Sequence, residues 1–330
     1  MYSVKNFSVT PNKVVVYSSI FENDGTPYRG KKSIMPKHNN ANGVISDRAS
    51  ERLKEKINWL VFKSKKQKVT YPDGTMSTNF RISFITLTLP TVQKHSDQEI
   101  KRVLNTFLTK LRQDYNMIDY VWKAELQRND NIHFHITTNV YISHQVVRSI
   151  WNRYIEKLGY VSDYKRKFLK MSFGEYRKLR LRNASLTGAS ISEERILKAY
   201  NDGQKNMWSN PNSTDVKAVF RVNSLSAYLA KYLSKKIKKS SLSAKAKARL
   251  KSFGNIWGCS YSLSRLKKYR DVLCSRWENF LYALSNVNGV LLRFYDYCEC
   301  FYFDIEKIPK NLQNPLKVFL NRYITSVSLS

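Results

Sequence analysis

An ordered run of strand and helix signals between residues 80 and 159 constrains the fold of this chain more than any other feature. Apolar and polar residues alternate in three segments, as they do in strands with one buried face. Two further segments repeat apolar residues at helical spacing. The first opens with the capping-box pair Ser96 and Glu99, and the second follows Ser143 and stops at Gly159. The expected elements are a strand at 80–89, a helix at 96–115, strands at 120–127 and 132–141, and a helix at 143–159.

A second strand and helix follow after a long interruption. Residues 216–222 alternate as a half-buried strand, and Asn223 or Ser224 caps a helix that runs to about Lys239. The interruption, residues 160–213, is polar, basic and weakly periodic apart from a helix after Ser192, which indicates an insertion.

Weaker signals precede and follow this region. Residues 14–17 predict a short strand, a helix begins at Ser46 or Asp47, and residues 68–71 lead through a Pro-Asp-Gly turn into the strand at 80–89. We therefore expect an N-terminal accessory segment at 1–67, a main domain at 68–265 and a C-terminal accessory segment at 266–330.

The charge balance indicates the chemical nature of the partner. The 57 Lys and Arg residues outnumber the 25 Asp and Glu residues, and the formal net charge of +32 is spread along the chain. A polyanion is the natural partner of such a surface. Charge alone does not separate enzymes of nucleic acids from packaging proteins, because attraction to phosphate is independent of sequence.

The cysteines and the hydropathy pattern indicate the redox state and the expected location of the protein. Four cysteines lack the paired spacing of a zinc site, so we interpret them as reduced thiols, with Cys298 and Cys300 on one face of an aromatic strand. No apolar stretch reaches the length of a membrane span and no signal layout opens the chain. The expected location is the cytoplasm, with no membrane partner.

The strand at 132–141 carries a candidate metal site. His133 and His135 are two residues apart, so both imidazoles point to the same side of the sheet. Glu125 and Gln127 precede them on the neighbouring strand, and a three- or five-residue connection places both on that same side. Two imidazoles and a carboxylate leave coordination positions free for water and a phosphate oxygen, which suits Mg²⁺ or Mn²⁺. Whether Glu125 or Gln127 completes the set stays open at this point.

The helix after residue 223 carries candidate nucleophiles. Tyr228 and Tyr232 are four residues apart and project from one helix face, and Lys231 and Lys235 follow each by three residues. An amphipathic helix with an inward leucine face would show the same spacing. The metal set and the tyrosines nevertheless complement each other, because a tyrosine of ordinary pKa is a poor nucleophile until the phosphate is activated.

Three motifs, in this order, resemble the HUH endonucleases and, within them, the two-tyrosine initiators of rolling-circle replication in small single-stranded DNA phages. The motifs are Phe84-Ile-Thr-Leu-Thr88, Glu125-Leu-Gln with His133-Phe-His135, and the run from Tyr228 to Lys235. Gly254 to Ser260 adds a weaker similarity. The resemblance implies an α+β fold, a central antiparallel β-sheet flanked by helices, which the alternation and capping support in part.

The resemblance also implies a reaction and its partners. One tyrosine attacks the scissile phosphate of single-stranded DNA at a replication origin, leaving a 5′-phosphotyrosine and a 3′-OH, and the strand is later rejoined. A host polymerase would extend the 3′-OH, a host helicase would open the duplex, and the setting would be the bacterial cytoplasm. Two other interpretations remain: a transposase or relaxase-like nickase of the same superfamily, or a non-catalytic single-strand binder.

Overall fold

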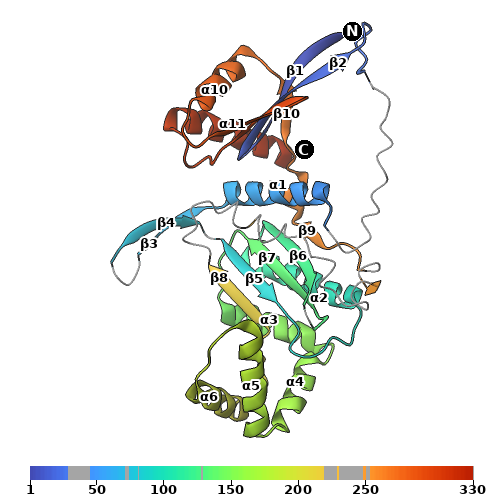
Figure 1. The fold of residues 1–330 in the computed structure, drawn as a ribbon, viewed down its shortest axis with the longest axis vertical. Helices are drawn as coiled ribbons and strands as arrows, with labels where there is room; N and C mark the ends of the chain where they lie inside the picture. Colours follow the sequence, from blue (N-terminus) through green and yellow to red (C-terminus); the bar gives the residue numbers. More distant parts are fainter. Residues whose placement is uncertain are drawn as a thin grey trace.

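The computed structural model describes residues 1–28, 45–70, 74–80, 82–127, 129–218, 229, 248–249 and 253–329. Within them the chain forms an α+β structure with two five-stranded antiparallel sheets, so the expected fold class is confirmed. One sheet is built from the middle of the sequence and the other from its two ends, with helix α1 (Asp47–Lys63) between them (Figure 1). None of the described helices is both long and apolar enough to cross a membrane.

The central sheet has the order β8-β5-β7-β6-β9, and every neighbouring pair is antiparallel. Its strands are, in chain order, β5 (Ser83–Leu87), β6 (Tyr120–Leu126), β7 (Ile132–Thr138), β8 (Thr214–Ala218) and β9 (Trp257–Cys259). The expected strands at 120–127 and 132–141 are confirmed, although the second ends at Thr138. The short edge strand β9 lies in the Gly254–Ser260 segment.

Two helices cover one face of the central sheet. They are α2 (Asp97–Tyr115) and α3 (His144–Glu156), and both begin at the expected caps: Ser96 forms a capping box with Glu99, and Ser143 accepts from the Val146 N–H. Ile85, Leu87, Phe134 and Ile136 project from β5 and β7 into this core and are fully buried. The alternate side chains of β5 and β7 therefore form the other face of the sheet.

The expected strand at 80–89 is wrong in one respect. The chain forms two strands here: β4 (Met76–Phe80) pairs with β3 (Lys66–Thr70), while β5 begins at Ser83 in the central sheet. The sequence Met-Ser-Thr-Asn-Phe has no continuous apolar face to bury, and the β3–β4 ribbon projects from the body of the molecule (Figure 1). Ser83, by contrast, is fully buried and donates to the Val140 carbonyl over 2.7 Å.

Residues 160–213 contain more helix than their weak periodicity indicates. The helix after Ser192 is confirmed as α6 (Glu193–Lys205), and it is preceded by α4 (Tyr160–Leu169) and α5 (Phe173–Thr187). The three helices lie beyond α3 at one end of the molecule (Figure 1) and have a small core of their own. That core consists of Phe168, Tyr176, Ile196 and Trp208.

The terminal sheet joins the two ends of the chain. Its order is β10-β1-β2-β12-β11, again antiparallel throughout. The strands are β1 (Tyr2–Thr10), β2 (Lys13–Phe21), β10 (Tyr269–Val272), β11 (Leu291–Tyr295) and β12 (Cys298–Tyr302). Helices α10 (Ser275–Ser285) and α11 (Lys310–Leu329) pack on it, and the short α9 (Tyr261–Arg265) connects the two sheets along the chain.

Two smaller expectations concern α1 and the cysteines. The α1 helix begins after Ser46, whose hydroxyl accepts from the Ala49 N–H, as expected. All four cysteines are free, and Cys298 and Cys300 share one face of β12 with their sulfurs 3.9 Å apart. Both findings agree with the sequence analysis.

Candidate metal centre

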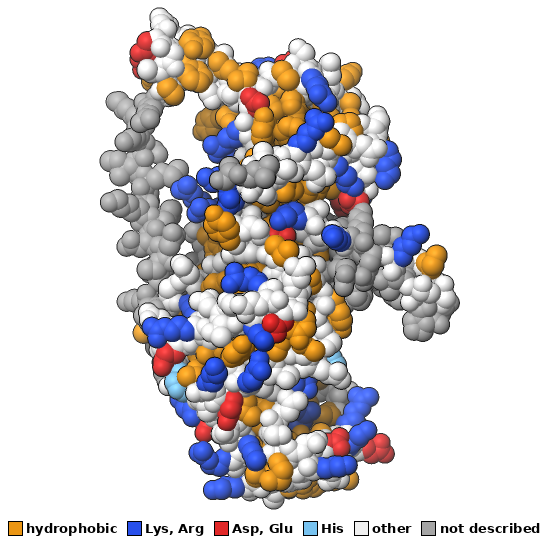
Figure 2. All heavy atoms as spheres, turned by 180° about the vertical axis from the view of Figure 1, so that it is seen from behind, with side chains coloured by type: hydrophobic (Ala, Val, Ile, Leu, Met, Phe, Trp, Pro, Cys, Tyr) orange, Lys and Arg blue, Asp and Glu red, His pale blue; other side chains and the backbone are white. Residues whose placement is uncertain are grey.

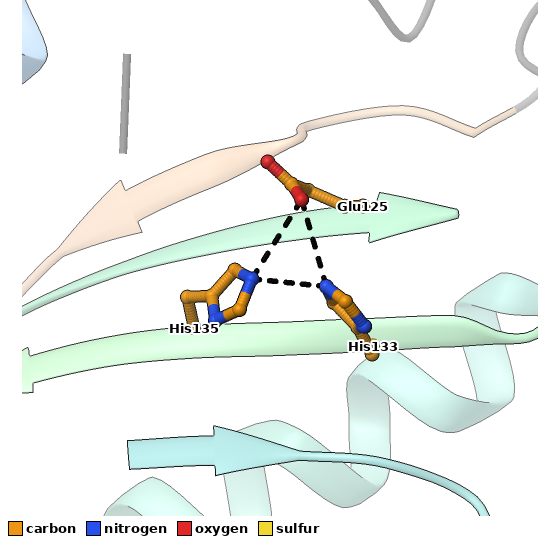
Figure 3. Close-up of side chains that lie close together, drawn as sticks. All are labelled: Glu125, His133 and His135. Carbon is orange, nitrogen blue, oxygen red and sulfur yellow. Dashed lines mark hydrogen bonds and ion pairs between the residues drawn. The ribbon is translucent and has the colours of Figure 1, made fainter. Parts of the chain in front are cut away.

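Strands β6 and β7 bring a carboxylate and two imidazoles together on the face of the central sheet opposite the α2–α3 core. Glu125 lies directly across from His133 in the ladder, and His135 is one pleat further along β7. The Nε2 atoms of the two histidines are 2.9 Å apart, and Glu125 Oε2 is 3.5 Å from the first and 3.6 Å from the second. All three side chains point toward one another (Figure 3).

The spacing of these atoms fits a single cation. Ligands of Mg²⁺ lie roughly 2.1 Å from the ion, so two adjacent octahedral ligands are about 3 Å apart. The nitrogen–nitrogen separation matches that value, and the nitrogen–oxygen separations exceed it only slightly. Among the described residues, Glu125, His133 and His135 form the group of His, Cys, Asp or Glu side chains placed to hold a metal ion.

Neighbouring side chains orient the cluster. Thr86 lies opposite His135 on β5, and its Oγ1 is 3.2 Å from His135 Nδ1. A proton on Nδ1 that is donated to this hydroxyl leaves the Nε2 lone pair directed at the cluster. The ring of Phe84 stacks on the His135 imidazole with centroids 5.2 Å apart. His135 is therefore held on both its polar and its flat side.

Lys123 places a positive charge beside Glu125. Its side chain is only 2% exposed, and its Nζ is 2.5 Å from Glu125 Oε1, the oxygen not directed at the histidines. Burial works against ionisation of Glu125, but interactions with His133 and His135 and the charge of Lys123 hold the pKa of that carboxyl well below its usual range. Glu125 is thus an anion over the whole physiological pH range.

The sequence prediction for this cluster is accurate in geometry. The hairpin places Glu125, His133 and His135 on one side of the sheet, as the spacing requires. Gln127 lies just beyond the end of β6, where its backbone N–H donates to the Asn131 carbonyl over 2.8 Å. The structure brings Glu125 to the two histidines, and the choice between Glu125 and Gln127 as the third metal ligand stays a prediction.

Lys123 and Thr86 were not among the predicted site residues, although the sequence contains a signal for both. Lys123 has the same strand parity as Glu125, and Thr86 is the central residue of the Phe84–Thr88 motif. Side chains two apart on a strand share a face, so each belongs to the site face once the pairing is known. Their contacts with particular partners depend on the register, which local sequence does not show.

The predicted nucleophile helix falls outside the described residues. Tyr228, Lys231, Tyr232 and Lys235 are not placed, and their roles stay predictions. Leu229, between them, is described: it is helical, fully buried and part of the core that includes α1. Leu229 therefore occupies the buried position that an inward leucine face would give this one residue.

The fold and site define an antiparallel-sheet protein with a carboxylate–imidazole cluster on the sheet face opposite the α2–α3 core. A family comparison covers the same region. Residues 82–237 match the family described as Replication-associated protein ORF2. The matched segment is slightly less than half of the chain and contains the cluster, its neighbours and the predicted tyrosines. No curated protein and no solved structure matches the chain.

Proposed function

We propose that this chain initiates rolling-circle replication by nicking single-stranded origin DNA with a tyrosine and later rejoining the strand. The observation that carries the proposal is the convergence of Glu125, His133 and His135 at cation-binding spacing inside the segment that matches replication-associated proteins. A divalent ion held there, Mg²⁺ or Mn²⁺, supplies Lewis-acid activation of a phosphate oxygen.

The reaction is a transesterification at phosphorus. The phenolic oxygen of Tyr228 or Tyr232 forms a bond to the scissile phosphorus and gives its proton to solvent. The bond from phosphorus to the 3′ oxygen breaks, and that oxygen takes up a proton to become a 3′-OH. Lys231 and Lys235 add positive charge near the phosphate as negative charge develops in the transition state.

A second tyrosine allows the strand to be cut twice without an outside energy source. The 5′-phosphotyrosine conserves the energy of the phosphodiester, so a later attack by a 3′-OH rejoins DNA and releases the tyrosine. Alternating use of Tyr228 and Tyr232 would release a unit-length circle and begin the next round. A host polymerase and helicase then act on the 3′ end and the duplex, in the bacterial cytoplasm.

A covalent-adduct assay tests this proposal. The protein is incubated with labelled origin-containing single-stranded DNA and Mn²⁺ and resolved on a denaturing gel. We expect an adduct with the wild type and with either Tyr228→Phe or Tyr232→Phe, and none with the double variant. Tyr261→Phe is the matched control, because Tyr261 is 73% exposed and lies in α9, away from the cluster.

The outcomes separate the candidate functions. Loss of the adduct only in the double variant supports paired nucleophiles. An adduct without later release of circular DNA indicates a transposase or relaxase-like nickase. No adduct on any origin-containing DNA would leave a non-catalytic single-strand binder.

A further inference from the structure

The terminal sheet has one face packed on helices, and among the described residues its other face contributes no side chain to the core that those helices form. One face of the sheet holds all of its residues in that core: Phe7, Val9, Val14, Val16 and Phe301. The register pairs Phe7 with Val16, and it pairs both Val9 and Phe301 with Val14. On this packed side, Phe7 contacts Trp277 of α10 with ring centroids 4.5 Å apart, and Tyr269 contacts Phe319 of α11 at 4.8 Å. The alternate side chains along each strand form a second surface, which we call the open face.

The open face combines aromatic rings with cations. None of the strand residues on this face is acidic. Asp271 lies opposite Phe7 and Glu299 opposite Val16, so both acidic strand residues belong to the packed face. Ser8 and Cys300 on the open face are buried, so its accessible part lies around them. The strand register places three cations and four tyrosines on this face: Lys13, Arg270, Arg293, Tyr2, Tyr17, Tyr295 and Tyr302.

Two of the cations are held against a ring. Lys13 Nζ lies 4.8 Å from the centroid of the Tyr302 ring, and the Arg293 guanidinium lies 5.9 Å from the same ring. Burial opposes ionisation of Lys13, but the Tyr302 hydroxyl and nearby negative groups raise its pKa, so it stays a cation. Arg270 and Arg293 are exposed, and within the described part of the chain neither forms an ion pair. The charge of the two arginines is therefore available to an anionic ligand.

Other rings of this face are accessible from solvent. Tyr295 is 50% exposed, and Tyr17 lies two strands away in the same register row, with Cys298 between them. At the far end of the β1–β2 ribbon, Tyr2 and Phe21 stack with centroids 5.6 Å apart and planes within 17°. Flat rings next to cations are the composition of surfaces that bind unpaired bases.

We infer that the open face binds single-stranded DNA, with bases stacked on Tyr17 and Tyr295 and phosphates bound by Lys13, Arg270 and Arg293. The positive charge complements phosphate, and the exposed rings favour a single strand because the bases of a duplex already stack on each other. The match to replication-associated proteins makes DNA the strand to which the inference commits. This surface lies on a different sheet from the metal centre, so the inference is independent of the nicking chemistry.

Binding measurements with the full chain test the inference. Fluorescence anisotropy of labelled oligothymidine is recorded without added metal for the wild type, Tyr295→Ala, Tyr17→Ala and the Arg270→Ala/Arg293→Ala double variant. One stacked base is worth about 1–3 kcal/mol, so each tyrosine variant should lose roughly tenfold in affinity. The double arginine variant should lower the slope of log affinity against log salt by about 1.4, or about 0.7 for each phosphate that is no longer neutralised.

Three controls keep the inference falsifiable. Arg276→Ala/Arg322→Ala removes the same charge from exposed positions of α10 and α11, and should bind nearly as the wild type does. Tyr295→Phe keeps the ring and should retain affinity. Heparin carries charge without bases, so its binding should be unaffected by Tyr295→Ala. Melting curves check that each variant is folded.

The contrary results are equally specific. Unchanged oligothymidine affinity in the tyrosine variants would overturn base stacking. An equal loss in the α10–α11 control would reduce the effect to net charge. An equal loss on duplex DNA would overturn the single-strand assignment. Because no metal is present, these outcomes are separate from success or failure of the adduct assay.

Discussion

The two sheets of this molecule share an architecture and differ in what the faces opposite their main helical cores carry. Both are antiparallel and five-stranded, and both bury one face against helices. On the central sheet, Glu125, His133 and His135 converge on one point, supported by the buried Lys123. On the open face of the terminal sheet, rings and cations are spread over several strands and no acidic strand residue joins them. The surface of the chain is basic over several elements, as Figure 2 shows for one side.

This difference indicates how strongly each face should depend on single residues. A convergent, partly buried cluster depends on every member, because each side chain supplies a contact that no neighbour replaces. A distributed surface depends on the sum of many weak contacts. We therefore expect single substitutions to have large effects on the central sheet and moderate effects on the terminal sheet.

The largest effect should follow removal of an imidazole. His133→Ala or His135→Ala leaves two groups where three are needed to hold the cation, and we expect adduct formation to fall by about a thousandfold or more. Affinity for single-stranded DNA should remain nearly unchanged, because it is spread over many cations. His144→Ala, at an exposed position at the start of α3, is the matched control and should cut normally.

That experiment also tests the separation between the two sheets. Adduct formation is measured on denaturing gels and DNA binding by anisotropy with the same protein preparations. A parallel loss of both properties would show that the metal cluster is part of the DNA-binding surface. The division between a convergent and a distributed face would then be wrong.

An intermediate effect should follow loss of the hydroxyl that orients His135. Thr86→Val keeps the shape of the side chain and removes the partner 3.2 Å from His135 Nδ1. Groups that orient a metal-binding histidine typically change metal affinity by about 10–100-fold, so we expect a loss in this range. Titration with Mn²⁺ followed by electron paramagnetic resonance measures it.

Thr86→Ser is the matched variant for this prediction. It restores the hydroxyl with one methyl group fewer, and metal affinity should return close to the wild-type value. Equal weakening by Val and Ser would assign the effect to strand packing. Unchanged affinity in Thr86→Val would show that Phe84 alone positions the ring.

Local sequence predicted the central sheet far better than the terminal one. Strands β6 and β7 alternate clearly and are joined by a short connection, so their pairing and the shared face of Glu125 and His133 follow from parity alone. The α2 helix follows from its capping box. In each case the interacting residues are close in sequence, and short-range patterns contain the necessary information.

The terminal sheet depends on pairings between distant residues. Strand β2 pairs with β12, with Tyr17 opposite Cys298, and no local pattern indicates which partner a strand will choose across such a separation. The helices α4 and α5 were missed for another reason. The α5 helix buries only Tyr176 in the local core, and no apolar stripe marks it. The α4 helix does have such a stripe, Tyr160, Tyr164 and Phe168, but it is short and lies directly after Gly159, where the preceding helix is expected to stop.

The smallest expected effect concerns two lysines that attach helices to the rest of the molecule. Lys101 of α2 and Lys56 of α1 both donate to a backbone carbonyl, of Phe253 and Leu266 respectively. Burial lowers the pKa of both lysines, that of Lys101 from 10.5 to about 8, with Asp97 opposing the shift and Arg249 adding to it. Both helices are thus attached through a lysine whose pKa is lowered by burial.

A lysine of lowered pKa makes stability depend on pH in a definite direction. Between pH 8 and 10.5 the folded protein has lost the Lys101 proton that the unfolded chain still holds, so unfolding takes up a proton and the free energy of unfolding rises with pH. We expect the wild type to gain about 1–2 kcal/mol relative to Lys101→Met over this window, measured by urea unfolding at several pH values. Groups that titrate in both proteins cancel in the difference.

Lys110→Met is the control, because Lys110 lies on the same helix and pairs with Asp114 at the surface. Curves for wild type and Lys101→Met that stay parallel would show that Lys101 remains solvated, and that α2 is held by its apolar contacts alone.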